Sequence, residues 1–166
     1  MNATLMLSIT SLAAAHASLD QPLATFEAAD LALKQAFGHK LFTILMYDKA
    51  VTESIRVYAN LKGDYPMLGR KKIVSDKWKS CLFEDGLPFV GHTAEDIKLA
   101  FSDHELIQSL GCESVLNLPV RWNGQTIGTV NLLHAANWYK DVDLAAATVH
   151  AQLLAPALMS LQATVF

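Results

Sequence analysis

The sequence predicts an α+β fold in which a mostly antiparallel sheet lies between two layers of helices. Two β-hairpins carry this prediction, one in which residues 40–47 pair with residues 53–60 and one over residues 114–134. Segments with helical spacing of apolar residues precede the first hairpin, separate the two hairpins and follow the second. We therefore expect the terminal helices on one face of the sheet. The long excursion, residues 65–110, should cover the other face and leave a concavity beneath it.

Length and composition favour one globular domain. A chain of 166 residues buries most of its surface on folding, and we expect a helical extension over residues 1–18 before a single domain over residues 19–166. Apolar residues make up 52% of the sequence and charged residues 17%, which argues against disorder. The net charge of −3 argues against a general nucleic-acid-binding protein.

The N-terminal segment is apolar over residues 3–15 but too short to span a bilayer. Ala15-His16-Ala17 resembles a signal-peptidase site, yet no lysine or arginine precedes the apolar segment. A helix that docks on the domain or on a partner subunit is therefore favoured over a signal peptide. Cys81 and Cys112 form no disulfide framework, which fits a reducing compartment. We expect a cytoplasmic protein that binds neither membranes nor nucleic acid.

The first helix of the domain is expected over residues 23–37. Pro22 suits its first turn, Ser18 or Asp20 is available as its cap, and Gly38 is the expected stop. Apolar residues follow heptad spacing along it. A helix packed on its own sheet and a helix paired across a dimer both fit this pattern.

The second hairpin, residues 114–134, turns at Asn123-Gly124, a pair that suits the two positive φ angles of a type I′ turn. A two-residue turn would place Asn117 opposite Val130. Both faces of the hairpin are mostly apolar, so it should lie inside a sheet that is covered on both sides. Asn117 and Asn131 are then buried amides that need partners, and a bound ligand is one way to supply them.

The excursion contains one expected strand, residues 88–91, and two expected helices, residues 76–84 and 93–110. Three consecutive cations, residues 70–72, are expected in a loop. A solvated loop and an anion-binding loop both fit them.

The C-terminal element, residues 141–165, is expected to be one long helix with a kink at Pro156. Residues 3–17 and 23–37 add amphipathic segments at the other end of the chain. Because symmetric pairs are the commonest oligomers, we predict a homodimer built by these three segments.

Motifs in the second hairpin and the excursion resemble a known family. SVLNLPV followed by GQTIGTVNLL is similar to the closing strands of a GAF domain, and the resemblance covers roughly residues 23–161. A narrower resemblance is to small stand-alone GAF proteins from bacteria. The motifs of that group occur here as Tyr65-Pro66, Gly69-Arg70-Lys71, Trp78, Pro88-Phe89-Val90-Gly91, Asp96-Ile97 and residues 103–112.

The resemblance implies a GAF/PAS-like fold and the sensing of a small ligand. Relatives bind cyclic nucleotides, tetrapyrroles, haem or small metabolites between the sheet and the excursion, and one branch reduces free methionine sulfoxide with cysteines. That branch has its catalytic cysteine farther upstream of the strand that ends in Pro than Cys112 lies from Pro119. Neither Cys81 nor Cys112 lies in a recognisable bilin-attachment motif. We therefore expect no catalytic residue and no enzymatic activity.

A metal site could in principle combine His92, His104 and Cys112, because imidazole and thiolate ligands suit zinc. These residues contain no short ligand pair, and structural histidines and a buried cysteine explain them equally well, so we expect no metal. The sequence also lacks a Gly-rich phosphate loop and a GxSxG nucleophile motif.

The candidate ligand-binding residues are aromatic, basic, histidine and amide side chains. Arg70 is the expected charge anchor, because a guanidinium can hold a carboxylate or phosphate through two parallel bonds, although a surface salt bridge fits it as well. Trp78 is the expected apolar wall. The full set is Tyr58, Tyr65, Arg70, Trp78, His92, His104, Asn117 and Asn131.

These observations predict a small-molecule-binding regulatory module that passes ligand occupancy to a signalling partner through its terminal helices. They leave the cofactor and the ligand unknown. Two alternatives stay open: a free methionine sulfoxide reductase, and a dimerisation module whose cavity is empty and collapsed.

Overall fold

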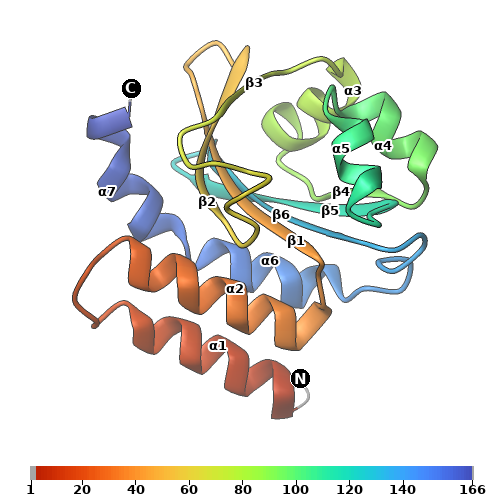
Figure 1. The fold of residues 1–166 in the computed structure, drawn as a ribbon. Coiled ribbons are helices and arrows are strands. Elements are labelled where there is room, and N and C mark those ends of the chain that lie inside the picture. The colour runs from red at the N-terminus through yellow and green to blue at the C-terminus, as the bar shows by residue number, and fades with distance from the viewer. Residues whose placement is uncertain (1–2, 166) are drawn as a thin grey trace.

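In a computed structural model, which describes residues 3–165 and the side chains of residues 3–162, a six-stranded antiparallel sheet forms the centre of the protein (Figure 1). Its strand order is β3-β2-β1-β6-β5-β4. The strands are β1 (Leu41–Tyr47), β2 (Glu53–Ala59), β3 (Arg70–Lys72), β4 (Phe89–Gly91), β5 (Ser114–Trp122) and β6 (Gln125–His134).

Helices cover both faces of the sheet, and the predicted α+β architecture is confirmed (Figure 1). One face carries α1 (Ala3–Ala15), α2 (Leu23–Phe37), α6 (Leu144–Gln152) and α7 (Ala155–Val165). The other face carries the excursion, with α3 (Asp76–Lys79), the π-helical turn η1 (Ser80–Glu84), α4 (Ala94–Ala100) and α5 (His104–Ser109). Among the described helices, none is by itself long and apolar enough to cross a membrane. Only α6 and the first part of α7 taken together, across a bend of 42°, reach that length and composition.

The sheet separates two hydrophobic cores, because successive side chains of a strand point to opposite faces. Phe42 and Ile44 of β1 lie in the core under the terminal helices. Leu41 and Tyr47 of the same strand lie in the core under the excursion, together with Trp78. Burying a side chain such as Phe42 contributes about 1.5–3 kcal/mol to stability.

The N-terminal helices form two layers on the sheet. Leu12 of α1 is fully buried and shares a core with Phe26 of α2, so α1 docks on the domain. Gly38 ends α2 with a φ of 77°, and its N–H bonds back to the carbonyls of Leu33 and Lys34, as expected of a helix stop. The predicted cap is wrong: Pro22 occupies the N-cap position, and neither Ser18 nor Asp20 caps the helix.

The second hairpin has the predicted turn but a different register. Asn123 and Gly124 have φ values of 48° and 76°, as a type I′ turn requires. A bulge between Val120 and Arg121 adds one residue on the β6 side, so Asn117 pairs with Asn131 and not with Val130. The bulge therefore brings the two buried amides directly opposite each other.

Residues 70–72 form an edge strand and not the predicted loop. This strand, β3, pairs with β2, and Arg70 lies opposite Ile55. A run of three cations has low strand propensity, but an edge strand tolerates lysines, which also protect the edge from pairing with other chains.

Both long helices of the prediction are broken. Residues 93–110 divide into α4 and α5 because Phe101 leaves the helical conformation and its ring packs edge-on against Trp78. The C-terminal helix divides into α6 and α7 just before Pro156, which cannot donate to the carbonyl of Gln152.

Candidate functional site

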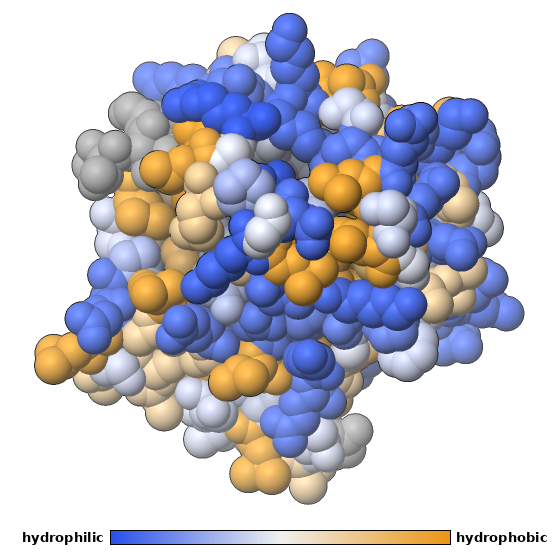
Figure 2. All heavy atoms as spheres, in the orientation of Figure 1, coloured by the Kyte–Doolittle hydropathy of each residue, from blue (hydrophilic) through white to orange (hydrophobic). Residues whose placement is uncertain are grey.

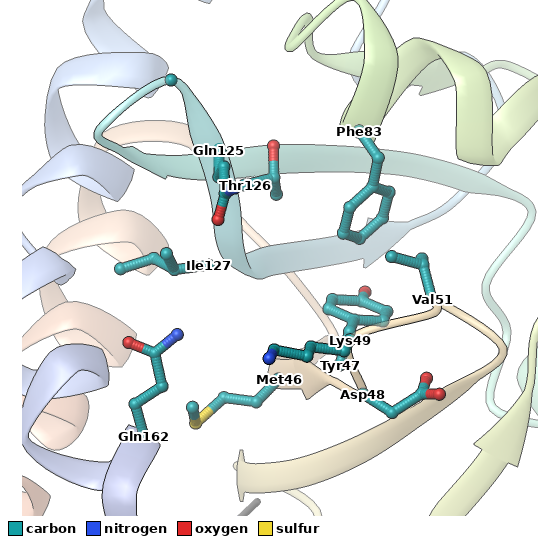
Figure 3. A pocket seen from close by; sticks show the side chains of 11 residues that line it. Met46, Tyr47, Asp48, Lys49, Val51, Phe83, Gln125, Thr126, Ile127 and Gln162 are labelled. Carbon is teal, nitrogen blue, oxygen red and sulfur yellow. The ribbon is translucent and has the colours of Figure 1, made fainter.

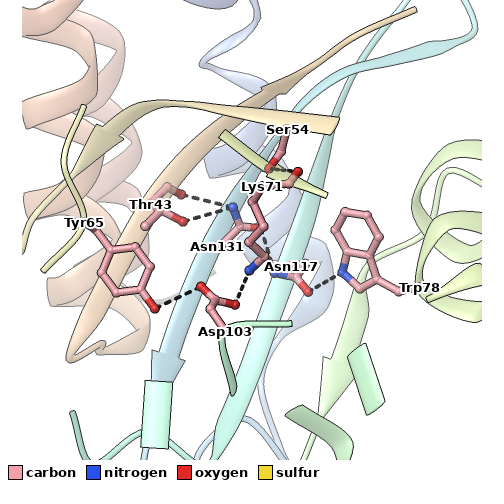
Figure 4. A network of polar contacts seen from close by, with 8 residues as sticks. All are labelled: Thr43, Ser54, Tyr65, Lys71, Trp78, Asp103, Asn117 and Asn131. Carbon is pink, nitrogen blue, oxygen red and sulfur yellow. Dashed lines mark hydrogen bonds and ion pairs between the residues drawn. The ribbon is translucent and has the colours of Figure 1, made fainter. Parts of the chain in front are cut away.

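A chain of side-chain hydrogen bonds crosses the interface between the sheet and the excursion (Figure 4). Trp78 of α3 donates its Nε1–H to Oδ1 of Asn117 over 2.9 Å. Nδ2 of Asn117 donates to Oδ1 of Asn131 over 2.7 Å, and Nδ2 of Asn131 reaches Oγ1 of Thr43 over 3.2 Å. The protein itself therefore supplies the partners of both buried amides, so a bound ligand, which was one way to supply them, is not needed for that purpose.

A charged cluster lies beside this chain (Figure 4). The Lys71 ammonium of β3 forms an ion pair with Oδ1 of Asp103, which lies in the loop between α4 and α5. The hydroxyl of Tyr65 donates to Oδ2 of Asp103 over 3.3 Å. The guanidinium of Arg56, from β2, lies 4.6 Å above the centre of the Tyr65 ring. This cluster joins the sheet edge to the excursion.

Burial shifts the proton equilibria of this cluster. Burial raises the pKa of Tyr65, and the negative charge of Asp103 raises it further. Burial lowers the pKa of Lys71, while the adjacent Asp103 carboxylate opposes that change. Burial also lowers the pKa of Arg56 from its usual value, although a guanidinium stays charged at neutral pH.

Arg56 is a buried cation with few partners. Only 8% of the surface of this residue is exposed. Its Nη1 donates to the carbonyl of Pro66 over 3.0 Å, whereas its Nε has no hydrogen-bond partner among the described residues. Within that same part of the chain, no carboxylate lies within ion-pair distance of it. A buried charge without a close counter-ion is unfavourable, and the favourable interactions of Arg56 are the more distant charge of Asp103 and the face of the Tyr65 ring.

The space around the cluster has a narrow inner part and a wider, more open outer part. Two inner voids of about 30 Å³ and about 20 Å³ lie between the sheet and the excursion. Outside them is an open basin of about 510 Å³. Figure 2 shows hydrophilic side chains over the upper part of the molecule, where β3 and the excursion lie. The basin is lined by four cations and two carboxylates: Arg56, Arg70, Lys71, Lys72, Asp64 and Asp103.

Four of the eight predicted site residues meet at this interface. Tyr65, Trp78, Asn117 and Asn131 all face the excursion side of the sheet (Figure 4). Arg70 lines the outer basin, but its Nη1 pairs with Oε2 of Glu53 over 2.7 Å, and its side chain is 53% exposed. Of the two interpretations of Arg70, an anion anchor and a surface salt bridge, the second describes its contacts.

The other three candidates lie elsewhere. Tyr58 is on the opposite face of the sheet, where its hydroxyl donates to Asp30 of α2 over 2.9 Å. His92 follows β4, its carbonyl accepts from the N–H of Asn137, and its Nδ1 is buried without a partner among the described residues. His104 begins α5 and lines neither void.

The sequence analysis missed Arg56 and Asp103 as candidates, and considered Lys71 only as part of a basic loop. One signal was available for Arg56: it stands between Ile55 and Val57 in an apolar strand, where an arginine is unusual. Asp103 gave no such signal, because its contacts depend on how the excursion folds back on the sheet.

A second hollow lies at the far end of the sheet (Figure 3). It has a volume of about 670 Å³ and lies where β1 ends and β6 begins, near the last described turn of α7. Its polar side chains include Lys49 and Gln162, while Tyr47 already bonds Oγ1 of Thr129 over 2.7 Å. Among the described side chains that line it, none has a buried polar atom without a partner. Those side chains provide space but no polar group that would select a ligand.

The environment of both cysteines disfavours the thiolate form. Cys112 is fully buried and Cys81 partly buried, and both thiols are free. Burial raises the pKa of both thiols, which keeps them protonated. Across residues 3–165, no group of three or more histidine, cysteine, aspartate or glutamate side chains is placed to hold a metal ion.

This geometry defines the class of protein: a two-sided α+β domain with a charged cluster and an open basin between its sheet and its excursion. No protein-family model and no curated protein matches the sequence. Solved structures do match. The GAF domain of a phosphoenolpyruvate-protein phosphotransferase from Coxiella burnetii superposes with a TM-score of 0.75 at 13% identity, over 96% of this chain and 95% of the other.

Two more GAF structures match over similar lengths. The nlh2 GAF domain of A. aeolicus, in an inactive state, gives a TM-score of 0.71 at 11% identity, over 96% of this chain and 97% of the other. The GAF domain of a two-component sensor histidine kinase from Bacillus halodurans gives 0.63 at 15% identity, over 88% and 97%. The chain therefore has the fold of a GAF domain.

Proposed function

We propose that this protein is a sensory or regulatory GAF module that binds a small molecule between its sheet and its excursion. The observation that carries the proposal is the charged cluster of Arg56, Lys71, Asp103 and Tyr65, buried beneath an open basin. Charges are rarely placed in such an interface for stability, because their desolvation offsets much of their attraction. The structural neighbours come from sensor and transfer proteins, which supports the same function.

Binding requires the excursion to move. The inner voids of about 30 Å³ and 20 Å³ are far smaller than the roughly 300–1,000 Å³ of typical ligand pockets. We propose that an entering ligand displaces the loop between α4 and α5, and that the arrangement described above is the closed state of the module. Proteins of this kind respond to a ligand by a shift between closed and open populations.

The terminal helices are suited to transmit this change. On β1, Thr43 contacts the buried amide chain, while its neighbours Phe42 and Ile44 pack under α2 and α6. A displacement of β1 by a ligand therefore reaches the terminal helices directly. We propose that these helices pass the signal to a protein partner in the cytoplasm.

The test is a search for the ligand itself. Native mass spectrometry of protein purified from its own host should show a bound small molecule, and a metabolite panel should contain a compound that raises the melting temperature. At a hundred times its dissociation constant a ligand stabilises the fold by about 2.7 kcal/mol, which corresponds to a rise of about 5–10 °C. No bound mass and no stabilising compound would instead favour a dimerisation module, an alternative that the nearly closed interface also suits.

The proposed module is not an enzyme. A methionine sulfoxide reductase needs a thiolate nucleophile, whereas burial raises the pKa of Cys112 and Cys81. Cys112→Ser and Cys81→Ser should leave ligand binding unchanged, and the wild type should not reduce free methionine sulfoxide. Reductase activity that is lost in Cys112→Ser would establish the alternative.

A further inference from the structure

The guanidinium of Arg56 has no carboxylate within ion-pair distance among the described residues, although Asp103 attracts it from farther away. Of the guanidinium donors, only Nη1 makes a hydrogen bond within the described chain, and its acceptor is the uncharged carbonyl of Pro66. The guanidinium lies against the backbone of Gly69. A Cβ at that position would lie 2.6 Å from Nη1, so only a glycine leaves room for the guanidinium there. The Nε–H is therefore buried, and no acceptor in the described chain bonds to it.

The inner void beside Arg56 has an excess of positive charge. Its lining includes two cations, Arg56 and Lys71, and one carboxylate, Asp103. Asp103 is fully engaged by Lys71 and Tyr65 and does not reach ion-pair distance of Arg56. The two positive charges in the lining of this void are therefore balanced by only one carboxylate in the same lining.

We infer that this site takes a small molecule with a carboxylate group, which displaces the Asp103 carboxylate from Lys71 and which Lys71 and Arg56 then hold between them. The inference rests on the proposed function and names the ligand class and the regulation of that same site. A carboxylate fits because Asp103 already shows that one satisfies Lys71 and accepts from Tyr65. A planar guanidinium edge also matches a carboxylate through two parallel bonds. The rest of the molecule occupies the basin of about 510 Å³.

Asp103 then acts as a built-in competitor. It lies in the loop between α4 and α5, so its release from Lys71 and Tyr65 frees that loop from the sheet edge. Ligand binding and opening of the excursion become one event. The affinity of the wild type is reduced by the work of displacing Asp103.

The experiment is isothermal titration with sodium acetate, succinate, citrate and inorganic phosphate, at constant ionic strength balanced with chloride. Asp103→Asn removes the competing charge but keeps an oxygen acceptor for Tyr65. We expect it to bind the best carboxylate at least about tenfold more tightly than the wild type. Glu53→Gln is the matched control, because it removes a carboxylate of the neighbouring strand whose ion pair is with Arg70 and not with Lys71.

Arg56→Met tests the anchor. Methionine fills similar space without a charge, and binding should weaken by at least about thirtyfold. The matched control is Arg70→Met, which removes a cation of the basin that is half exposed and already paired. Its loss should weaken binding no more than about threefold, because salt screens exposed charges.

A second measurement on the wild type does not depend on variants that fold. The Nε–H resonance of Arg56, assigned by its absence in Arg56→Lys, should shift on titration with the carboxylate and not with chloride. The inference is overturned if Asp103→Asn binds the carboxylate no more tightly than Glu53→Gln, or if Arg56→Met and Arg70→Met bind it with equal affinity. It is also overturned if phosphate binds better than every carboxylate, or if the Nε–H resonance of Arg56 does not shift. A neutral compound that binds equally to Arg56→Met would leave the proposed function standing and remove this inference. No binding by any compound to any variant would remove both.

Discussion

Asn117 shows at the scale of one residue how a polar group is accommodated in this protein. It is 2% exposed, accepts from the indole N–H of Trp78 and donates to Asn131. The sequence predicts its burial from the apolar hairpin around it. It does not predict its partners, because Trp78 lies 39 residues away in the excursion and Asn131 becomes its partner only through the bulge in β6.

We predict that Asn117→Leu lowers the free energy of unfolding by about 2–5 kcal/mol, because it leaves the indole N–H of Trp78 and the Oδ1 of Asn131 buried without partners. Urea denaturation measures the change. In a Trp78→Phe background the same substitution should lower the free energy of unfolding by less, since the indole N–H that Asn117 accepts from is already absent. Equal costs in the two backgrounds would mean that the Trp78–Asn117 bond contributes nothing.

At the scale of elements, the start of α4 shows a complete capping box. Thr93 accepts from the N–H of Asp96, and the Asp96 carboxylate accepts from the backbone N–H of Thr93 and of His92. The bond from the His92 N–H, followed by those from Thr93, holds the pKa of Asp96 below its usual range. The charged form of Asp96 therefore stabilises the fold.

We predict a pH-dependent loss in Asp96→Asn. A carboxylate whose pKa is lowered by folding contributes stability above its unfolded pKa of about 3.9, and that contribution is lost as the pH falls through the lower folded pKa. The variant should be less stable than the wild type by about 1 kcal/mol at neutral pH, and the difference should disappear in strong acid. Thermal melts from pH 7 to pH 2 test this. Glu95→Gln, beside it in the same turn, should not reproduce the effect.

Gly128 links two elements, β6 and α7. A Cβ there would lie 2.7 Å from Cδ1 of the fully buried Leu158 and 2.8 Å from the carbonyl oxygen of Leu45. We predict that Gly128→Ala destabilises the fold by about 1–3 kcal/mol, since a backbone atom cannot yield easily. The control is Gly63→Ala, where the new methyl group would meet nothing within 4 Å. Equal denaturant midpoints for Gly128→Ala and Gly63→Ala would contradict the prediction.

At the scale of the whole molecule, periodicity in the sequence predicts the layers but not the contacts between them. The two hairpins, α2 and the order of the layers are confirmed because each depends on local pattern and turn chemistry. The strand β3 and the break between α4 and α5 could not be predicted in this way. They depend on pairing with β2 and on the packing of Phe101 against Trp78, which are contacts across the fold.

The candidate site divides along the same line. Trp78, Asn117 and Asn131 could be selected as candidates because a buried polar or aromatic group is visible in a local pattern. The ion pair of Lys71 with Asp103 joins residues 32 positions apart, and no local pattern predicts that these two residues meet. The expected anchor Arg70 and its neighbour Lys71 lie on successive positions of β3, so one is half exposed and the other is largely buried.

The last prediction concerns assembly. The terminal helices on this side of the sheet expose large apolar side chains, among them Leu7 of α1 at 65% and Leu31 of α2 at 71%. Exposed leucines on a helical layer favour pairing with a second copy, and we predict a homodimer through this layer. Sedimentation equilibrium at micromolar concentration should give twice the mass of 18.1 kDa for the wild type and a monomer for Leu7→Glu combined with Leu31→Glu. Leu99→Glu is the control, because Leu99 is 67% exposed on α4, on the other side of the sheet, and its change should leave the dimer intact. A wild type with only the monomer mass would contradict the prediction, and so would a dimer that Leu99→Glu dissociates and the double variant does not.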